Sequence, residues 1–390
     1  MKNMRYPEKT MQQYKVRGNA KMKRQIPIAK PLLGRDEEEA IKQVLRSGML
    51  VQAKQVKSFE DTFADYIGVK HAVAVTNGTI ALDLALKVLK LGLDDEVIVP
   101  AFSFIATGNC VLFQGAKPVF ADINQRTFNI DSSDVNEKIT ARTRAIIPVH
   151  MFGQPARMDA LKEIAHDHNL FLIEDAAQSH GAEYHGQKTG SLGDVGCFSF
   201  YATKNMTTGE GGMLTTNNRE LARTARLLRD HGQTEKYHHT ILGYNYRMTE
   251  LPAAVGLVQL NKLDELNEKR IKNAKMLNAG IETIRGLTPP YVAGHVKHVF
   301  YQYVIRVEDD YPLARNELAD HLEEMGIGVA VHYPMPIYKQ PLYREKDYEK
   351  TICPVAEDSC ERVLSLPVHP SVDDEDIQYI AAKLKAHSLS

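Results

Sequence analysis

Residues 171–176 read Phe-Leu-Ile-Glu-Asp-Ala, a short apolar run that ends in two acidic residues followed by alanine. Six similar runs rich in Val, Ile and Phe lie on either side of it, at residues 71–76, 96–100, 118–123, 144–150, 196–200 and 212–216. Amphipathic helical stretches, such as residues 80–91 and 158–168, separate several of these runs. Apolar strands that alternate with helices are typical of a mostly parallel sheet covered on both faces. We therefore predict an α/β fold with a mostly parallel seven-stranded sheet, whose ligand binds at the carboxyl ends of the strands.

The pattern changes after about residue 250. The elements expected there are a long polar helix at 251–281, a strand at 299–307 after Pro289-Pro290, a helix at 313–325 ended by Gly326, a strand at 327–332, a Pro-rich loop and a last helix that begins at Asp373. These elements indicate a smaller α+β domain. We expect a large cofactor-binding domain at residues 27–260 and a small C-terminal domain at residues 261–390.

The composition excludes several classes of protein. The 390 residues include 48 Lys and Arg against 49 Asp and Glu, and 43% of them are hydrophobic, which is usual for a soluble globular protein and unlike a disordered, collagen-like or coiled-coil chain. No apolar run approaches the ~18–20 residues needed to cross a bilayer, so we expect no membrane partner. Four cysteines without a C-x-x-C pair predict neither a disulfide framework nor a metal site, and they favour a cytoplasmic protein.

The first 24 residues hold eight of the basic residues and one acid. A basic arm on an acidic body could bind nucleic acid, but it has no apolar stretch and is not a secretory signal. We favour a flexible N-terminal extension over residues 1–26 and expect no nucleic-acid partner.

A turn that can bind an anion follows the first run. Residues 75–79 read Val-Thr-Asn-Gly-Thr and precede a helix. Backbone N–H groups at the start of a helix bind anions, and Gly78 and Thr79 would allow close approach and add a hydroxyl. The alternative is an ordinary strand–helix turn with a capping threonine.

Asp175 stands at the end of run 171–176, where a parallel sheet presents its ligands. A carboxylate at the tip of a buried strand is costly to desolvate unless a cation meets it. A protonated ring nitrogen or a metal ion would serve. An aspartate that caps the next helix is the alternative.

Lys204 lies in the segment Gly-Cys-Phe-Ser-Phe-Tyr-Ala-Thr-Lys-Asn at residues 196–205, after an apolar run and before Gly211-Gly212. A partly desolvated lysine in such a loop can form a Schiff base with an aldehyde, whereas a lone lysine is usually a surface cation. Ser199 precedes it by five residues, and the glycines leave room for a cofactor.

Together these sites suit one ligand, which has a phosphate, a ring nitrogen that needs an anion and an aldehyde that needs an amine. Pyridoxal 5′-phosphate is that ligand. The sequence contains no G-x-S-x-G, G-x-x-x-x-G-K-[ST], G-x-G-x-x-G or H-E-x-x-H motif to favour another chemistry.

The motifs around Asp175 and Lys204 are specific. They are residues 174–181 (Glu-Asp-Ala-Ala-Gln-Ser-His-Gly), 191–194 (Ser-Leu-Gly-Asp), 197–205 and 209–213 (Gly-Glu-Gly-Gly-Met). In these motifs the chain resembles the DegT/StrS family of fold-type-I, pyridoxal-phosphate-dependent aminotransferases, which act on keto sugars that are usually attached to a nucleotide. Residues 243–248, 331–334 and 366–370 extend the resemblance, which covers about residues 27–385.

The resemblance implies a role for each matching residue. Lys204 would bind the cofactor covalently, and Asp175 would pair with its ring nitrogen. The remaining cofactor contacts would be Gln178 near the ring hydroxyl, Phe104 stacked on the ring, and Gly78, Thr79 and Ser199 at the phosphate.

Three further positions follow from the resemblance. In the family, the asparagine that matches Asn245 reaches the phosphate of the neighbouring subunit, which implies a homodimer with shared active sites. Arg247 and His332 are weaker candidates for substrate contacts.

The resemblance implies an aminotransferase that moves an amino group from L-glutamate to a nucleotide-linked keto-deoxy sugar, in the synthesis of a polysaccharide or glycoconjugate. Lys204 argues against the branch of the family that has histidine there and acts as a dehydratase. Two alternatives stay open, which are an aminotransferase of a cyclitol ketone and a DNA-binding regulator with the same fold. An intact set of Lys204, Asp175 and Ser199 speaks against the regulator.

Overall fold

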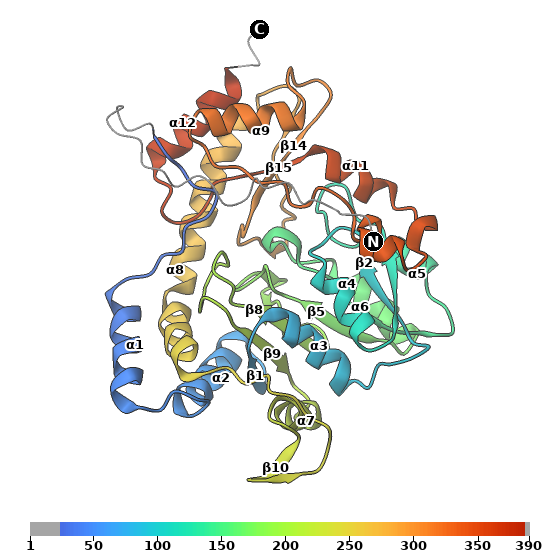
Figure 1. The fold of residues 1–390 in the computed structure, drawn as a ribbon. Coiled ribbons are helices and arrows are strands. Elements are labelled where there is room, and N and C mark those ends of the chain that lie inside the picture. The colour runs from blue at the N-terminus through green and yellow to red at the C-terminus, as the bar shows by residue number, and fades with distance from the viewer. Residues whose placement is uncertain (1–23, 387–390) are drawn as a thin grey trace, which may run out of the picture.

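Seven strands form the central sheet of the computed structural model, which describes residues 24–386 (Figure 1). In spatial order they are β1 (His71–Val75), β9 (Gly212–Thr216), β8 (Val195–Ser199), β5 (Phe171–Asp175), β4 (Thr143–Ile146), β2 (Glu96–Pro100) and β3 (Lys117–Ala121). β9 is antiparallel to both of its neighbours, and every pair from β8 to β3 is parallel. The prediction of a mostly parallel seven-stranded sheet is confirmed.

Helices cover both faces of this sheet, and successive side chains of each strand point to opposite faces. In β1, Val73 and Val75 pack in the cluster that includes α3 (Gly78–Val88), α4 (Ala106–Phe113) and α7 (Arg219–Arg229). Ala72 and Ala74 pack with α2 (Lys54–Ile67) and α8 (Glu250–Ile281) on the opposite face. α5 (Ser132–Glu137) and α6 (Met158–Asp167) pack on this second face beside β2, β4 and β5. Burial on both faces explains why the runs are apolar almost throughout.

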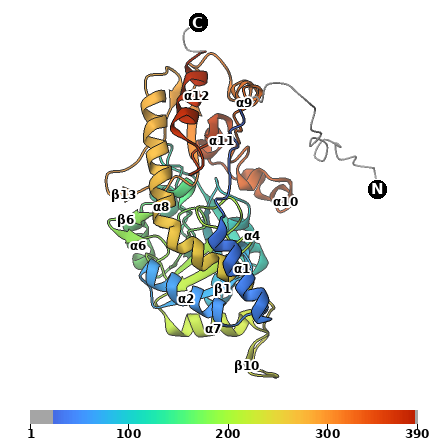
Figure 2. The same ribbon diagram turned by 90° about the vertical axis from the view of Figure 1, so that its left-hand side faces the viewer.

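A second apolar cluster lies around a small antiparallel sheet of β12 (Leu287–Thr288), β14 (Tyr303–Val307) and β15 (Val363–Leu366). It includes side chains of α9 (Arg315–Glu324), α12 (Asp374–Lys385) and the second half of α8. The 32-residue α8 contacts α1 (Arg35–Ser47) and α2 near one end and α12 near the other, so it runs along both parts of the molecule (Figure 2).

The remaining elements are short. They are the strands β6 (Glu183–Tyr184), β7 (Gln187–Lys188) and β13 (Val296–Lys297), the hairpin β10 (Gln233–Glu235) and β11 (His238–His239), the helices α10 (Pro341–Arg344) and α11 (Pro354–Arg362), and the 3-10 turns Met151–Gly153, Ile337–Lys339 and Tyr348–Lys350. The β10–β11 hairpin projects from the end of the molecule that carries α7 (Figure 1).

Two expectations for the C-terminal half are wrong. Residues 327–332 form no strand, because Ile327 and Ala330 make only isolated bridges, to Ile26 and Ser365. The strand expected from residue 299 begins at Tyr303, because Phe300 has a left-handed φ of 44° that interrupts the extended backbone. The expected start of the last helix is confirmed, since the Asp373 side chain accepts a hydrogen bond from the N–H of Asp376 at 2.8 Å.

Several further sequence expectations concern cysteines, membrane segments and metal sites. The four cysteines are buried and free. Within residues 24–386, no helix combines the length and apolarity that a membrane crossing needs, and no three His, Cys, Asp or Glu side chains gather as a metal site would require. Most of the basic N-terminal extension, residues 1–23, lies outside the described residues.

Candidate active site

The turn from β1 into α3 lies against the end of β8. Asn77 caps α3, since its Oδ1 accepts a hydrogen bond from the N–H of Ile80 at 2.9 Å, so the alternative of a capping threonine is wrong. Gly78 is so close to Ser199 that a Cβ atom added at Gly78 would lie 2.5 Å from the Ser199 Cβ. Only glycine fits there, and the first N–H groups of a helix attract anions. The turn and Ser199 therefore form a cradle suited to a phosphate.

Asp175 ends β5 at the carboxyl edge of the sheet and is 5% exposed. Its Oδ2 accepts a hydrogen bond from the Thr107 hydroxyl at 2.8 Å, and its Oδ1 accepts one from the N–H of Ala177 at 3.2 Å. Burial raises the pKa of Asp175, and these two hydrogen bonds and the charge of Lys204 only partly oppose that rise. A cationic group placed against Asp175 would relieve the cost of burying its charge. Thr107 was not anticipated from the sequence.

Lys204 lies in the loop that follows β8, and its backbone N–H donates a hydrogen bond to the carbonyl of Tyr201 at 3.0 Å. Its Nζ lies 4.1 Å from the centroid of the Tyr301 ring. Its positive charge lowers the pKa of Asp175, so the two residues that the motifs singled out interact in the fold. Tyr301 was missed, because it lies almost 100 residues away in the chain and no local pattern marks it.

His332 belongs to the same group of side chains. Its Nδ1 lies 3.0 Å from the Ser365 hydroxyl, and burial together with the charge of Lys204 lowers its pKa to about 4. A neutral imidazole beside Lys204 can accept or donate a hydrogen bond to a bound substrate.

Gln178 and Phe104 both lie near another aromatic residue, Tyr333. The Gln178 Oε1 accepts a hydrogen bond from the N–H of Phe152 at 2.8 Å, and its Nε2 lies 3.5 Å from the Tyr333 hydroxyl. The ring of Phe104 lies 6.4 Å from that of Tyr333 and is 56% exposed. Burial and the nearby Tyr301 and Asp175 raise the pKa of Tyr333, so its phenol stays protonated. Tyr333 follows His332 in a quoted motif, but its place in the site was not anticipated.

Asn245 and Arg247 lie on the segment that returns from the β10–β11 hairpin. Asn245 is exposed and forms an isolated bridge with Asp230. Arg247 forms an ion pair with the same Asp230, and its backbone bridges to Val75 at the end of β1. A role for Arg247 in substrate binding would require it to leave or share this ion pair.

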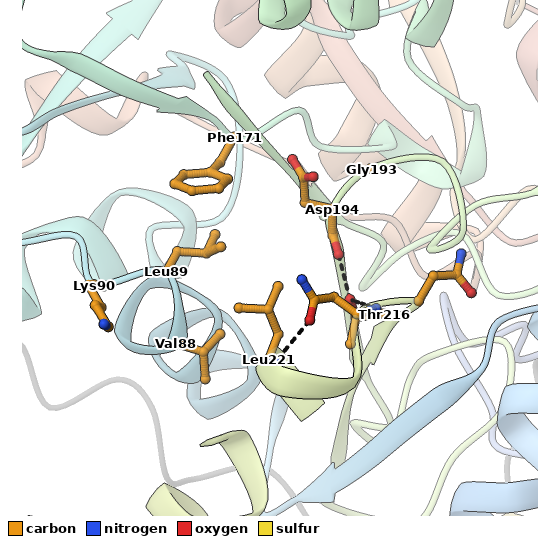
Figure 3. Close-up of a pocket in the computed structure, with 10 residues that line it drawn as sticks. Val88, Leu89, Lys90, Phe171, Gly193, Asp194, Thr216 and Leu221 are labelled. Atoms are coloured by element: carbon orange, nitrogen blue, oxygen red, sulfur yellow. Dashed lines mark hydrogen bonds between the residues drawn. The ribbon is translucent and has the colours of Figure 1, made fainter. Parts of the chain in front are cut away.

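A separate surface hollow of about 680 Å³ lies at the opposite edge of the sheet, where Phe171 begins β5 (Figure 3). Two of its polar residues are engaged within the fold. The Asp194 Oδ2 accepts from the N–H of Leu172 at 2.8 Å, and the Thr216 hydroxyl donates to the Asp194 carbonyl at 2.7 Å. The chemistry-bearing side chains are therefore those at the carboxyl edge.

The carboxyl edge suits a group with three features. The cradle at Gly78 and Ser199 suits a phosphate, Asp175 suits a protonated ring nitrogen, and the amine of Lys204 suits an aldehyde. Within the described part of the chain, neither Asp175 nor Lys204 forms an ion pair of 4 Å or less that would occupy it. The donor set therefore fits pyridoxal 5′-phosphate.

Comparisons with known proteins agree with this chemistry. Residues 31–385 match the model of the DegT/DnrJ/EryC1/StrS aminotransferase family. The chain is 40% identical to GDP-perosamine synthase of Caulobacter vibrioides, over 92% of this chain and 97% of that protein. It is also similar to two solved structures. DesV of S. venezuelae has a TM-score of 0.87 at 37% identity and covers 91% of this chain and 94% of its own. The PLP-form of Spr1654 from Streptococcus pneumoniae has a TM-score of 0.89 at 30% identity, over 94% and 99%.

Proposed function

The chain belongs to the DegT/DnrJ/EryC1/StrS aminotransferase family and is a transaminase, and we propose that it moves an amino group from L-glutamate to a nucleotide-linked keto sugar with pyridoxal 5′-phosphate as cofactor. The relative named GDP-perosamine synthase supports a sugar attached to a nucleotide. The PLP-form of the similar structure supports the cofactor.

One observation supports the proposal most. A buried carboxylate, Asp175, ends β5, and a lysine amine, Lys204, follows β8, at the carboxyl edge of a sheet that also presents a glycine-lined anion cradle. A binding protein has no need of a reactive amine beside an unpaired carboxylate, whereas a transaminase needs both.

Pyridoxal 5′-phosphate, when bound, supplies an aldehyde for amines and a ring that withdraws electrons from the α-carbon of the donor. We assign Gly78, Thr79 and Ser199 to hold its phosphate. Gln178 and Phe104 would lie beside its ring.

The two charged residues would do the proton chemistry. Asp175 would keep a carboxylate against the proton on the ring nitrogen, and its burial makes that interaction strong. The Nζ of Lys204, once neutral, can accept a proton from the α-carbon of the donor and deliver it elsewhere in the site. His332 and Arg247 are proposed to contact the sugar substrate.

We also propose a homodimer in which Asn245 of one subunit completes the site of the other. We assign residues 27–260 to the cofactor-binding domain and 261–390 to the smaller domain. The four free cysteines support a cytoplasmic enzyme, because free thiols persist where the compartment is reducing.

The visible absorption spectrum of the purified protein, before and after L-glutamate, tests the proposal. We expect a yellow band that glutamate bleaches, and a Lys204→Arg variant, matched in charge, that does not respond. The bleached protein is then titrated with nucleotide keto sugars and, in parallel, with a cyclitol ketone, and recovery of the band identifies the acceptor. A protein that shows no band after incubation with the cofactor would contradict the proposal and favour a regulator.

A further inference from the structure

The phenol ring of Tyr301 lies against the amine of Lys204. The Lys204 Nζ is 4.1 Å from the ring centroid, within the range of a cation–π contact. The Tyr301 hydroxyl lies 3.1 Å from the hydroxyl of Thr203, the residue directly before Lys204. Tyr301 therefore contacts two consecutive residues of the lysine loop, although it precedes β14 in the C-terminal half of the chain.

The backbone around Tyr301 is held in place from two sides. Gly153, at a φ of 100°, packs so closely that an added Cβ would lie 3.0 Å from the Tyr301 nitrogen, and its carbonyl accepts the N–H of Val299 at 3.0 Å. Arg270 of α8 donates from Nη1 to the carbonyls of Phe300 and Tyr301 at 3.3 and 3.4 Å. Because this segment is braced on both sides, the ring is kept against Lys204 by the fold.

Among the buried arginines that the structure describes, Arg270 has no carboxylate partner, whereas Arg229 and Arg306 do. Arg270 is 5% exposed, and burial lowers its pKa to about 10. A buried guanidinium is costly unless it is well bonded, and the only side-chain hydrogen bonds found for it in the described part of the chain go to the two carbonyls beside Tyr301. Because burying this cation is costly, its hydrogen bonds to residues 300 and 301 indicate that the fold depends on a fixed position of this backbone segment.

The electrostatics of Tyr301 differ from those of other buried tyrosines. Burial alone would raise the pKa of Tyr301, but the charge of Lys204 and the hydrogen bond with Thr203 contribute to lowering it below its ordinary value. Tyr303, two residues along, has no such cation, and burial raises its pKa.

The other titratable groups around the pair come from separate elements. Tyr301 interacts electrostatically with Arg270 of α8 and with Tyr333. Lys204 interacts electrostatically with Asp175 of β5, His180 and His332. The two histidines have pKa values lowered to about 3 and about 4, so they stay neutral near neutral pH. The charge of Lys204 favours the ionised forms of both Tyr301 and Asp175.

We propose that Tyr301 is the proton partner of Lys204, so that phenol and amine share one proton. In one form the phenolate faces the ammonium, and in the other the phenol faces the neutral amine, with one proton moved from Nζ to Oη and no change in total charge. The neutral amine is the form that attacks a carbonyl carbon or accepts a proton. Once the pair has lost one proton, the neutral amine of Lys204 can form by transfer of the remaining proton from Nζ to the Tyr301 oxygen. Tyr301 is a positioning residue in this scheme, since it acts through Lys204, and the inference rests on the proposed function.

Ultraviolet difference spectra of the cofactor-free protein, titrated with base, test the pairing without any assay of turnover. We expect one tyrosine to ionise below the ordinary pKa of about 10. That step should be absent in Tyr301→Phe, which keeps the ring, and should move to higher pH in Lys204→Met, which removes the cation. Tyr303→Phe is the matched control, since it also deletes a buried phenol, and it should leave the step unchanged.

The same variants separate this inference from the proposed function. If wild type shows no early step, or if the step persists in Tyr301→Phe or does not move in Lys204→Met, the pairing is wrong whatever reaction the enzyme catalyses. If the pairing holds, Tyr301→Phe should slow bleaching of the visible band by L-glutamate about 10²-fold near neutral pH. The loss should shrink as the pH rises, because solvent can then remove the proton. An equal loss at every pH would show a merely structural role and would overturn the inference.

Discussion

Glu174 and Asp175 are adjacent at the end of β5, and their carboxylates point to opposite faces of the central sheet. Glu174 is fully buried and accepts hydrogen bonds from the N–H groups of Gly190, Leu192 and Gly193 at 2.6 to 2.7 Å. Asp175 meets Thr107 and Ala177 on the other face and keeps a pKa raised by burial. The Glu174 carboxylate thus holds the loop at residues 190–193, whereas the Asp175 carboxylate is the one that a ligand could bind.

Exchanging each acid for its amide should separate these two roles. Glu174→Gln replaces one acceptor oxygen by an N–H₂ group that faces backbone donors, so we expect the free energy of unfolding to fall by about 3 kcal/mol or more. Asp175→Asn removes a charge whose burial is costly, so stability should change little while transamination slows about 10²–10³-fold. Urea unfolding and the rate of the glutamate half-reaction, measured on both variants, check this. Equal effects of both variants on either quantity would contradict the assignment.

The cradle at the start of α3 can be filled with a single methyl group. In Gly78→Ala the new Cβ would lie 2.5 Å from the Ser199 Cβ, so the turn and β8 must separate. We expect the affinity for pyridoxal 5′-phosphate to fall at least about tenfold, which is about 1.4 kcal/mol. Gly294→Ala is the control, because an added Cβ there meets nothing within 4 Å. Equilibrium titration of the cofactor-free variants gives both affinities, and unchanged binding in Gly78→Ala would remove the cradle from the site.

Local pattern was sufficient to predict the sheet and to select Asp175 and Lys204 as candidates for its site. Strands buried on both faces must be apolar throughout, so runs such as residues 171–176 were visible in the sequence, and polar groups at their ends, such as Asp175, marked the ligand edge. Lys204 was found for the same reason, since it follows the apolar strand β8.

Partners from distant parts of the chain could not be found in this way. Tyr301 and Thr107 meet Lys204 and Asp175 only after the chain has folded, and neither belongs to a pattern with a period. The direction of β9 was equally hidden, because an apolar strand has the same composition in either direction. The strand expected at 327–332 failed for the converse reason, since a β-rich run forms a strand only where a neighbour offers continuous pairing.

Two buried histidines should make the protein sensitive to acid. Burial lowers the pKa of both His180 and His298 to about 3, from an ordinary value of 6.5. Between these values the unfolded chain binds protons that the folded protein cannot, so stability is complete above about pH 6.5 and is lost as the pH falls toward 3. Each histidine should contribute a slope of up to about 1.4 kcal/mol per pH unit.

His298→Asn tests this slope, because the Asn Oδ1 can replace the Nδ1 that accepts the N–H of Phe300 at 2.9 Å. Urea unfolding at several pH values should show a shallower dependence in this variant. The exposed His166→Asn is the control and should keep the slope of wild type. A wild-type slope in His298→Asn would mean that His298 is protonated in the folded protein.

Shared active sites predict that two inactive variants restore each other. Asn245 is exposed beside a projecting hairpin segment where Tyr237 and Leu242 are 81% and 82% exposed, which is the kind of surface that a second subunit covers (Figure 1). Lys204→Ala alone and Asn245→Ala alone should both have low activity. In an equal mixture of exchanged subunits, half of the dimers contain one chain of each kind. One of the two sites in such a dimer combines an intact Lys204 with the partner subunit's Asn245, so about a quarter of wild-type activity should return.

The control mixture combines Lys204→Ala with Asp175→Asn. Both defects then belong to the part of the site that one chain supplies, so every site in the mixed dimer carries one of them and no activity should return. Recovery in the first mixture but not in the second would place Asn245 across the subunit interface. If the first mixture recovers nothing although sedimentation shows that mixed dimers have formed, Asn245 acts within its own chain, and the exposed segment must serve another purpose.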